Sequence, residues 1–148
     1  MAEPDLGRLL LEGHRAIASD LVASLDERGF PGMRAGHAAL FVHIDRRSGT
    51  RLTELSRRAR MTKQGMMLVV DDLEERGYVR RVPDPEDARA KVVKLTARGR
   101  RCAAESRRAV QALESRTRRL LGDRRYELLR ESLEELVVTS REELEVET

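Results

Sequence analysis

The chain has 148 residues, of which 37% are charged and 40% are hydrophobic, and its formal net charge is +3. This length predicts a single domain, 1–148, and leaves little room for a large enzyme fold. Two Phe, two Tyr and no Trp are too few to build a surface that stacks single-stranded bases. RNA-recognition sheets and cold-shock barrels are therefore excluded.

The single cysteine, Cys102, excludes an internal disulfide framework and a cysteine-rich zinc site, and we expect it to be a small buried residue. The N-terminus is acidic before a short apolar run, and no apolar stretch approaches the roughly 18 residues that cross a bilayer. We expect a soluble, cytoplasmic protein that makes no contact with a membrane.

The charges are unevenly distributed along the chain. Residues 51–101 carry 14 basic and 8 acidic side chains, whereas residues 122–148 carry 4 and 9. A compact basic segment is what a phosphate-binding surface requires, because neutralised phosphates release their counterions. The alternative interpretation is a solvated helix face.

Apolar residues recur at helical spacing through the first half of the chain. The pattern predicts helices over 5–28, 34–45, 51–60 and 62–76. Thr62 is the expected N-cap of the fourth helix, and Gly77 is its expected end.

After Gly77 the apolar period changes from helical to alternating. Residues 78–82 and 90–95 are predicted strands, and the polar, proline-rich segment between them is the loop of a β-hairpin. A long helix is expected over 96–121, with Thr96 as its N-cap, and a last amphipathic helix follows Gly122 and Asp123.

Three helices followed by a hairpin, within residues 34–95, is the order of a winged helix-turn-helix. The predicted fold class is mainly α with a small two-stranded β-wing. The long terminal segments, 5–30 and 96–146, carry apolar stripes that the small winged helix-turn-helix region cannot cover. This favours dimerisation across a two-fold axis. The alternative is a monomer whose terminal helices form their own bundle.

Residues 52–100 closely resemble the MarR family of bacterial transcription regulators. Five separated motifs carry the resemblance, in order: LTELS, MTKQ, LEERGYVRR, PDPEDARAK and KLTARGR. The resemblance implies a homodimeric winged helix-turn-helix protein, dimerised through its first and last helices. Such a protein binds a palindromic operator in double-stranded DNA and is often released by a small aromatic or phenolic effector.

The fourth helix is the expected recognition helix, with Met66, Val70 and Leu73 inward and its N-terminal side chains toward base edges in the major groove. Apolar Met67 and Leu68 depart from the commoner family pattern, in which polar or basic residues stand there. They could contact a thymine methyl group, or they could be buried core. The DNA-binding candidates in this helix are Thr62, Lys63, Gln64, Gly65, Met67 and Leu68.

The wing loop is expected to carry a cation at its tip. Arg89 matches the family's minor-groove arginine, with Asp87 able to brace it. The alternative for Arg89 is a surface ion pair with Asp84 or Glu86. The expected phosphate contacts are Arg57, Arg58, Arg60, Arg80, Arg81, Lys91 and Lys94, each interchangeable with a solvated residue.

His37 and His43 do not share a helix face, so a metal site is not expected. The first two helices line the effector crevice in this family, which makes His14, Met33, His37, Phe41 and His43 the effector-binding candidates. The alternative for the histidines is that they are polar residues satisfied at an interface. The sequence contains no phosphate-binding glycine loop and suggests no catalytic triad, so we expect neither an enzyme nor a cofactor.

Three functions remain open at this point. The first is a repressor that responds to a ligand. The second is a winged-helix dimer that acts as a protein-interaction module, which the apolar face at Met67 and Leu68 motivates. The third is a constitutive DNA binder without an effector.

Overall fold

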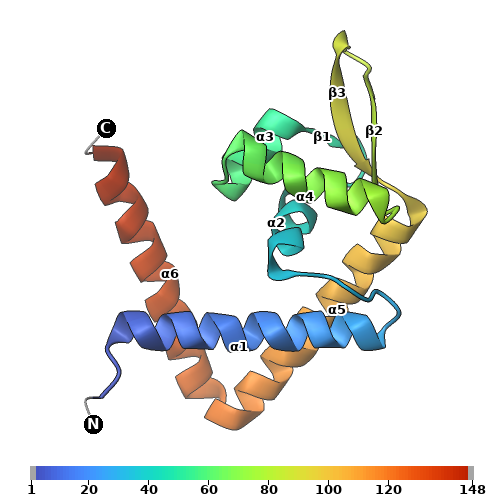
Figure 1. Ribbon diagram of the computed structural model, residues 1–148. Coiled ribbons are helices and arrows are strands. Elements are labelled where there is room, and N and C mark those ends of the chain that lie inside the picture. The colour runs from blue at the N-terminus through green and yellow to red at the C-terminus, as the bar shows by residue number, and fades with distance from the viewer. Residues whose placement is uncertain (1–2, 147–148) are drawn as a thin grey trace. The chain divides into compact units, whose positions relative to one another are not determined.

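The structure is a computed structural model that describes the backbone of residues 3–146 and the side chains of residues 3–140. Over this part of the chain it forms six helices and a three-stranded sheet (Figure 1). The elements are α1 (Leu6–Glu27), α2 (Ala35–His43), β1 (Thr50–Arg51), α3 (Leu52–Ala59), α4 (Lys63–Glu75), β2 (Val79–Asp84), β3 (Asp87–Leu95), α5 (Ala97–Leu121) and α6 (Asp123–Val146). The fold class predicted from the sequence, a mainly helical winged helix, is confirmed. None of the helices described is long and apolar enough to cross a membrane.

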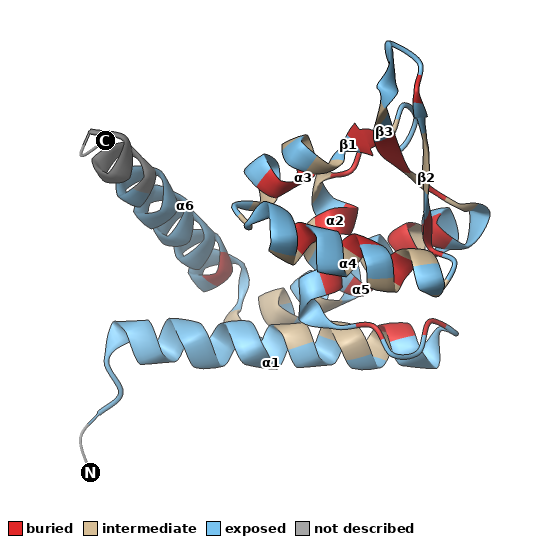
Figure 2. Cartoon of the chain, turned by 45° about the horizontal axis from the view of Figure 1, so that its top comes forward, coloured by how far each residue is buried: buried red, intermediate tan, exposed pale blue. Residues whose placement is uncertain are grey.

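The backbone contacts divide the chain into two compact units, Met1–Ala109 and Val110–Thr148. The first unit contains α1 to α4, the sheet and the first part of α5. The second contains the rest of α5 and α6. Figure 2 shows that most buried residues belong to the first unit, whereas α6 is exposed along nearly all of its described length.

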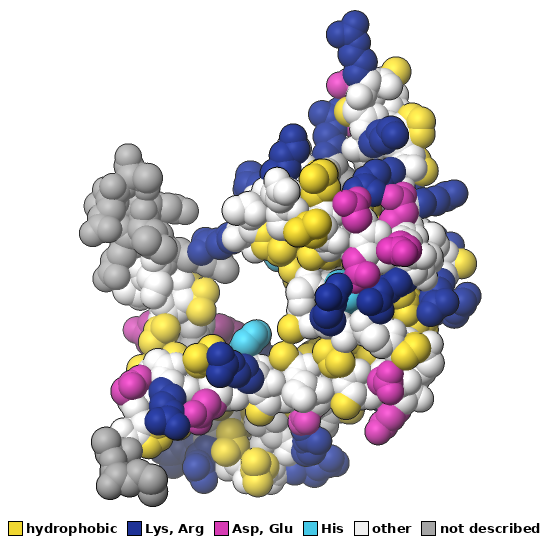
Figure 3. Space-filling view, viewed as in Figure 1, with side chains coloured by type: hydrophobic (Ala, Val, Ile, Leu, Met, Phe, Trp, Pro, Cys, Tyr) yellow, Lys and Arg dark blue, Asp and Glu magenta, His cyan; other side chains and the backbone are white. Residues whose placement is uncertain are grey.

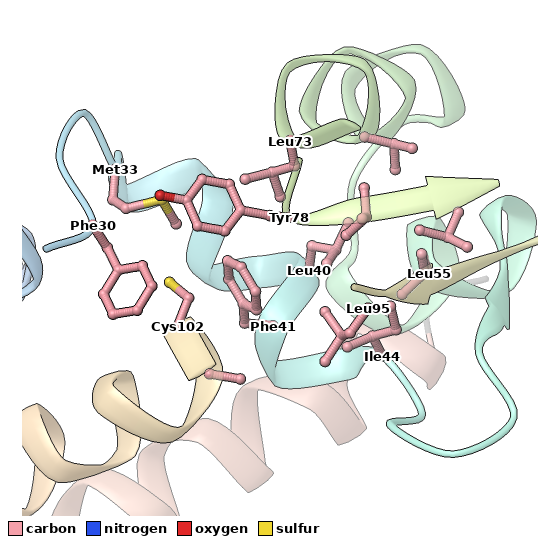
Figure 4. Close-up of a cluster of buried hydrophobic side chains, with 14 of the residues drawn as sticks. Phe30, Met33, Leu40, Phe41, Ile44, Leu55, Leu73, Tyr78, Leu95 and Cys102 are labelled. Atoms are coloured by element: carbon pink, nitrogen blue, oxygen red, sulfur yellow. The ribbon is translucent and has the colours of Figure 1, made fainter. Parts of the chain in front are cut away.

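The core of the first unit is built around Tyr78, which directly follows the turn after α4 (Figure 4). Its side chain is fully buried, and the centroid of its ring lies 6.2 Å from the ring centroid of Phe30 and 6.4 Å from that of Phe41. Arg98 lies 4.7 Å above the Tyr78 ring, and one of its guanidinium nitrogens donates to the tyrosine hydroxyl. The other fully buried hydrophobic members of this core are Leu40, Leu55, Met66, Val70, Leu73, Val79, Val93 and Cys102.

Cys102 is buried, as the sequence predicts. Burial raises the pKa of its thiol to about 11, although Ser106 and Arg98 act in the opposite direction. The reactive thiolate is therefore scarce at neutral pH.

The sheet differs from the sequence prediction in its number of strands and in the length of its hairpin loop. It has three strands in the order β1-β3-β2, because the very short β1 pairs through Thr50 and Arg51 with Val93 and Val92 of β3. The hairpin loop is also shorter than predicted, since β2 continues to Asp84 and β3 begins at Asp87. Pro83 is tolerated there because β2 is an edge strand, whose outer N–H groups need no partner in the sheet.

The junction between the hairpin and α5 is closed by Thr96, the predicted N-cap. Its hydroxyl accepts the Gly99 N–H at 3.0 Å and donates to the Gly77 carbonyl at 2.6 Å. Gly77 ends α4 with a φ of 77°, in the left-handed region that glycine adopts without strain. The predicted ends of α4 and the predicted start of α5 are thus confirmed by the bonds that make them.

In the second unit, Arg118 holds the turn between α5 and α6. Its guanidinium lies 4.4 Å above the ring of Tyr126 and pairs with Asp123 and Glu127. Tyr126 is the buried residue of α6 within the described side chains. This clamp fixes the start of α6, while the apolar residues farther along the helix stay exposed.

Candidate nucleic-acid interface

The recognition helix α4 begins at Thr62, as predicted. The Thr62 hydroxyl accepts the Gly65 N–H at 3.0 Å, which satisfies one of the free amide groups of the first turn. A Cβ atom at position 65 would lie 3.0 Å from that same hydroxyl oxygen and would crowd the cap. Lys63 and Gln64 follow the cap with exposed side chains, so the helix presents a cation and an amide in its first turn.

The outer face of α4 continues with two apolar side chains. Met67 is 38% exposed and Leu68 is 62% exposed, so the alternative that they belong to the core is wrong. Met66, Val70 and Leu73 are the inward residues, as predicted. Figure 3 shows apolar side chains over the first half of α4 and acidic side chains over its second half.

Arg81 has a different position from the one expected of a phosphate contact. Its guanidinium bonds Asp71 at 2.5 Å and also pairs with Glu74, and its backbone N–H donates to Glu74 at 2.8 Å. The charge of Arg81 is therefore directed at the acidic half of α4. The three contacts fasten strand β2 to the recognition helix and balance carboxylates that would repel a phosphate backbone.

The tip of the wing is braced from both sides. Asp84 is buried, accepts the Glu86 N–H at 2.9 Å and pairs with Arg51 of β1 at 2.5 Å. Asp87 accepts the backbone N–H of Arg89 at 3.0 Å, so it braces the chain at Arg89 rather than the guanidinium. These bonds hold the wing turn, which the sequence analysis expected to carry a cation at its tip.

The Arg89 side chain is exposed, and no acidic side chain in the described part of the chain lies within ion-pair distance of it. Asp84, one of the two partners considered for it, is taken by Arg51 instead. Figure 3 shows a basic side chain standing at the end of the hairpin. The wing thus presents an uncompensated guanidinium on a braced turn.

The remaining predicted phosphate contacts fall into three groups. Arg57 and Arg58 both bond Glu54, and these hydrogen bonds lower the pKa of Glu54 to about 2, so the pair already shares one negative charge. Lys94 is half-buried in β3. Arg60, Arg80 and Lys91 are exposed and have no ion pair among the described side chains, and the same holds for Lys63 of the recognition helix.

The structure does not gather the five effector candidates into one site. Met33 and Phe41 are buried members of the core, as Figure 4 shows. His37 is buried and bonded on both ring nitrogens, which is the alternative of a satisfied polar residue. His14 is exposed on α1 and His43 is partly exposed at the end of α2.

The bonds of His37 join α2 to the recognition helix. Its Nε2 lies 2.6 Å from Asp72, and its Nδ1 accepts the Arg34 N–H at 3.0 Å. Asp72 also accepts from the side chains of Arg34 and Arg76, and Arg76 reaches the Gly32 carbonyl. This network was not predicted from the sequence, although the helical period places Asp72 beside the inward face of α4.

The His37 network predicts a pH-dependent stability. Burial lowers the pKa of His37 below 6.5, although the hydrogen bond with Asp72 acts to raise it. The unfolded chain therefore binds a proton at a pH where the folded imidazole does not, and the free energy of unfolding falls as the pH drops below about 6.5. We expect His37→Gln to flatten this dependence in chemical denaturation between pH 7 and pH 5. Parallel curves for the two proteins would contradict it.

A helix-turn-helix followed by a braced hairpin, with exposed cations on both, defines a winged-helix protein. Residues 28–90 match the model of the MarR family. The winged helix-turn-helix of this chain is therefore similar to that of the MarR family. No curated protein sequence is significantly similar to the chain.

Solved structures share the fold over nearly the whole chain. A structure of CouR bound to a 23-mer DNA duplex has a TM-score of 0.75 at 22% identity and covers 92% of this chain and 99% of its own. CouR from Rhodococcus jostii RHA1 bound to p-coumaroyl-CoA has a TM-score of 0.70 at 25% identity, and the match covers 89% of this chain and 91% of that one. The MarR family protein Rv2887 of Mycobacterium tuberculosis, in complex with salicylic acid, has a TM-score of 0.65 at 27% identity. The match covers 90% of this chain and 97% of that one.

Proposed function

We propose that the protein is a homodimeric repressor that binds a palindromic operator in duplex DNA. In this proposal α4 enters the major groove, and Arg89 enters the minor groove beside it. The observation that carries the proposal is the uncompensated Arg89 guanidinium on a turn braced by Asp84 and Asp87. The exposed Lys63 and Gln64 in the capped first turn of α4 give a second point of contact.

Electrophoretic shift on a duplex that contains the protein's own promoter tests this proposal. Cations that neutralise phosphates release counterions, so the affinity should fall steeply with salt, by about 1,000-fold between roughly 50 and 200 mM for six phosphate contacts. Repression further predicts that transcription from this promoter falls when the protein is added. Absence of any salt-dependent duplex binding would contradict the proposal.

Exposed apolar stripes on two helices support the homodimer. In the first unit α1 leaves Leu6, Leu9, Leu10 and Ile17 exposed. In the second unit α6 leaves Leu129, Leu133, Leu136 and Val137 exposed, at the spacing of one helix face. A monomer that exposed both stripes would be prone to association, so we propose that they are covered by a second copy of the chain.

The dimer predicts the effect of a charge in the α6 stripe. Leu133→Glu would place a carboxylate in an apolar interface, and we expect a shift toward the monomer mass of 16.9 kDa in light scattering coupled to size-exclusion chromatography. Val138→Glu is the matched control, because Val138 is 51% exposed on the opposite side of the same helix. An unchanged mass for Leu133→Glu, or equal shifts for both variants, would argue against this face.

We further propose that a small aromatic or phenolic compound releases the DNA. CouR and Rv2887 were crystallised with p-coumaroyl-CoA and salicylic acid, which supports this chemical class. Of the effector candidates, His14 has an exposed side chain and His43 a partly exposed one, whereas Met33 and Phe41 are buried in the core and His37 is bonded on both ring nitrogens. A thermal-shift screen with salicylate and p-coumaroyl-CoA separates an effector-responsive repressor from a constitutive DNA binder.

A protein-interaction module is the second candidate function, and the exposure of Met67 and Leu68 favours it. The two candidates differ at the wing. A DNA-binding wing predicts that Arg89→Ala weakens duplex binding, whereas a protein-interaction module predicts no change in duplex affinity.

A further inference from the structure

The exposed apolar pair on α4 points to a specific kind of base contact. Leu68 and Met67 follow Gln64 by four and three residues, so the three side chains share the outer face of the first two turns. Leu68 lies opposite the buried residues Met66 and Val70 and is 62% exposed. A partner that binds the outer face of α4 would therefore contact Leu68.

The charges around the pair indicate what covers it. The exposed cations Arg60 and Lys63 precede it, while the carboxylates that follow it, Asp71 and Glu74, are bound by Arg81. An apolar pair beside free cations, with the charge of its acidic neighbours partly offset by Arg81, is complementary to a polyanion that also carries apolar groups. A protein partner with an apolar surface would satisfy the pair alone and would leave the cations unused.

Duplex DNA offers one apolar group in the major groove, the 5-methyl group of thymine. Against any other base edge, Leu68 would cover hydrogen-bonding groups without giving them a partner, which costs free energy. We propose that Leu68, with Met67 beside it, reads thymine methyl groups in the operator and is a specificity-determining residue. This inference rests on the proposed function.

Replacing every thymine of the promoter duplex by uracil tests the inference wherever in the fragment the operator lies. The promoter fragment is amplified with dTTP or with dUTP, and the primers are matched to each. Uracil pairs with adenine as thymine does and lacks only the methyl group. We expect the wild-type protein to bind the uracil duplex more weakly, by about fourfold for each methyl group in contact.

Variants identify the residue that makes the contact. Leu68→Ala should lose most of the preference for the thymine duplex, because the side chain that covers the methyl group is gone. Val42→Ala is the matched control, since Val42 is an apolar residue of α2 that is 73% exposed, and it should keep the preference. Thermal unfolding of both variants checks that they fold as the wild type does.

The outcomes separate the inference from the function on which it rests. Equal wild-type affinity for the two duplexes would overturn methyl readout while leaving salt-dependent DNA binding intact. A preference that survives in Leu68→Ala would mean that uracil changes the duplex itself, which also overturns the assignment to Leu68. Failure to bind either duplex would overturn the proposed function as well, and would favour a protein partner on α4.

Discussion

Gly99→Ala is expected to lower the free energy of unfolding by about 3 kcal/mol, a large effect for one methyl group. Gly99 is buried in the first turn of α5, where the helix passes close to the backbone of Tyr78, the residue that precedes β2. A Cβ atom there would lie 1.9 Å from the carbonyl oxygen of Tyr78 and 3.0 Å from its carbonyl carbon. Both are backbone atoms, so α5 or β2 would have to move, and Tyr78 would move with them.

Chemical denaturation followed by circular dichroism measures this loss. Gly13→Ala is the matched control, because Gly13 also lies within a helix and a Cβ atom there would meet nothing within 4 Å. Alanine is the better helix former, so this variant should gain about 0.5–1 kcal/mol. If the two variants have similar stability, the close approach of α5 to the Tyr78 backbone is wrong.

Arg89→Ala is expected to weaken binding to the promoter duplex by about 10- to 100-fold at fixed salt. Its guanidinium is the exposed cation at the wing tip, and a narrow minor groove concentrates the negative potential that attracts it. The variant should fold normally, because Arg89 contributes only its backbone N–H to the bonds of the turn. Fluorescence anisotropy with a labelled duplex measures the change.

Two further variants define the origin of that loss. Arg89→Lys keeps the charge without the planar guanidinium, so we expect it to recover only part of the affinity. Arg8→Ala removes an exposed arginine of α1 that is paired with Glu12, outside the winged helix, and should bind as the wild type does. Equal losses in Arg89→Ala and Arg8→Ala would reflect net charge rather than a contact by the wing.

The sequence predicted those elements that depend on local signals. Thr62, Gly77 and Thr96 mark helix ends through bonds to residues a few positions away, and the apolar period indicated which side of α4 faces the core. The same period left open whether Met67 and Leu68 contact DNA or belong to the core, and their exposure in the structure decides between the two. The helices were therefore predicted to within a few residues of their observed ends.

The features that the sequence missed depend on contacts between distant residues. Strand β1 is too short to show an alternating pattern, and it exists because Thr50 and Arg51 pair with β3. The shorter wing turn depends on the pairing of Asp84 with Arg51, 33 residues away. His37 and Asp72 are 35 residues apart, and neither has a local pattern that reveals the other.

Arg81 shows the same limit for a site residue. The count of basic residues near the wing made it a phosphate contact, because a linear sequence does not show which carboxylates lie beside a strand. The structure brings Asp71 and Glu74 of α4 against β2 and thereby gives Arg81 a role in positioning the wing. Charge counts predict a basic surface but not which of its members are free.

In the proposed complex, two copies of this winged helix bind one face of duplex DNA through α4 and Arg89. A hydroxyl-radical footprint on the promoter duplex tests it most directly, because it maps each contacted nucleotide on both strands. Two-fold symmetry predicts two protected half-sites about 10 bp apart on the same face of the helix. Protection of a single isolated half-site, or none at all under conditions of full binding, would contradict the claim.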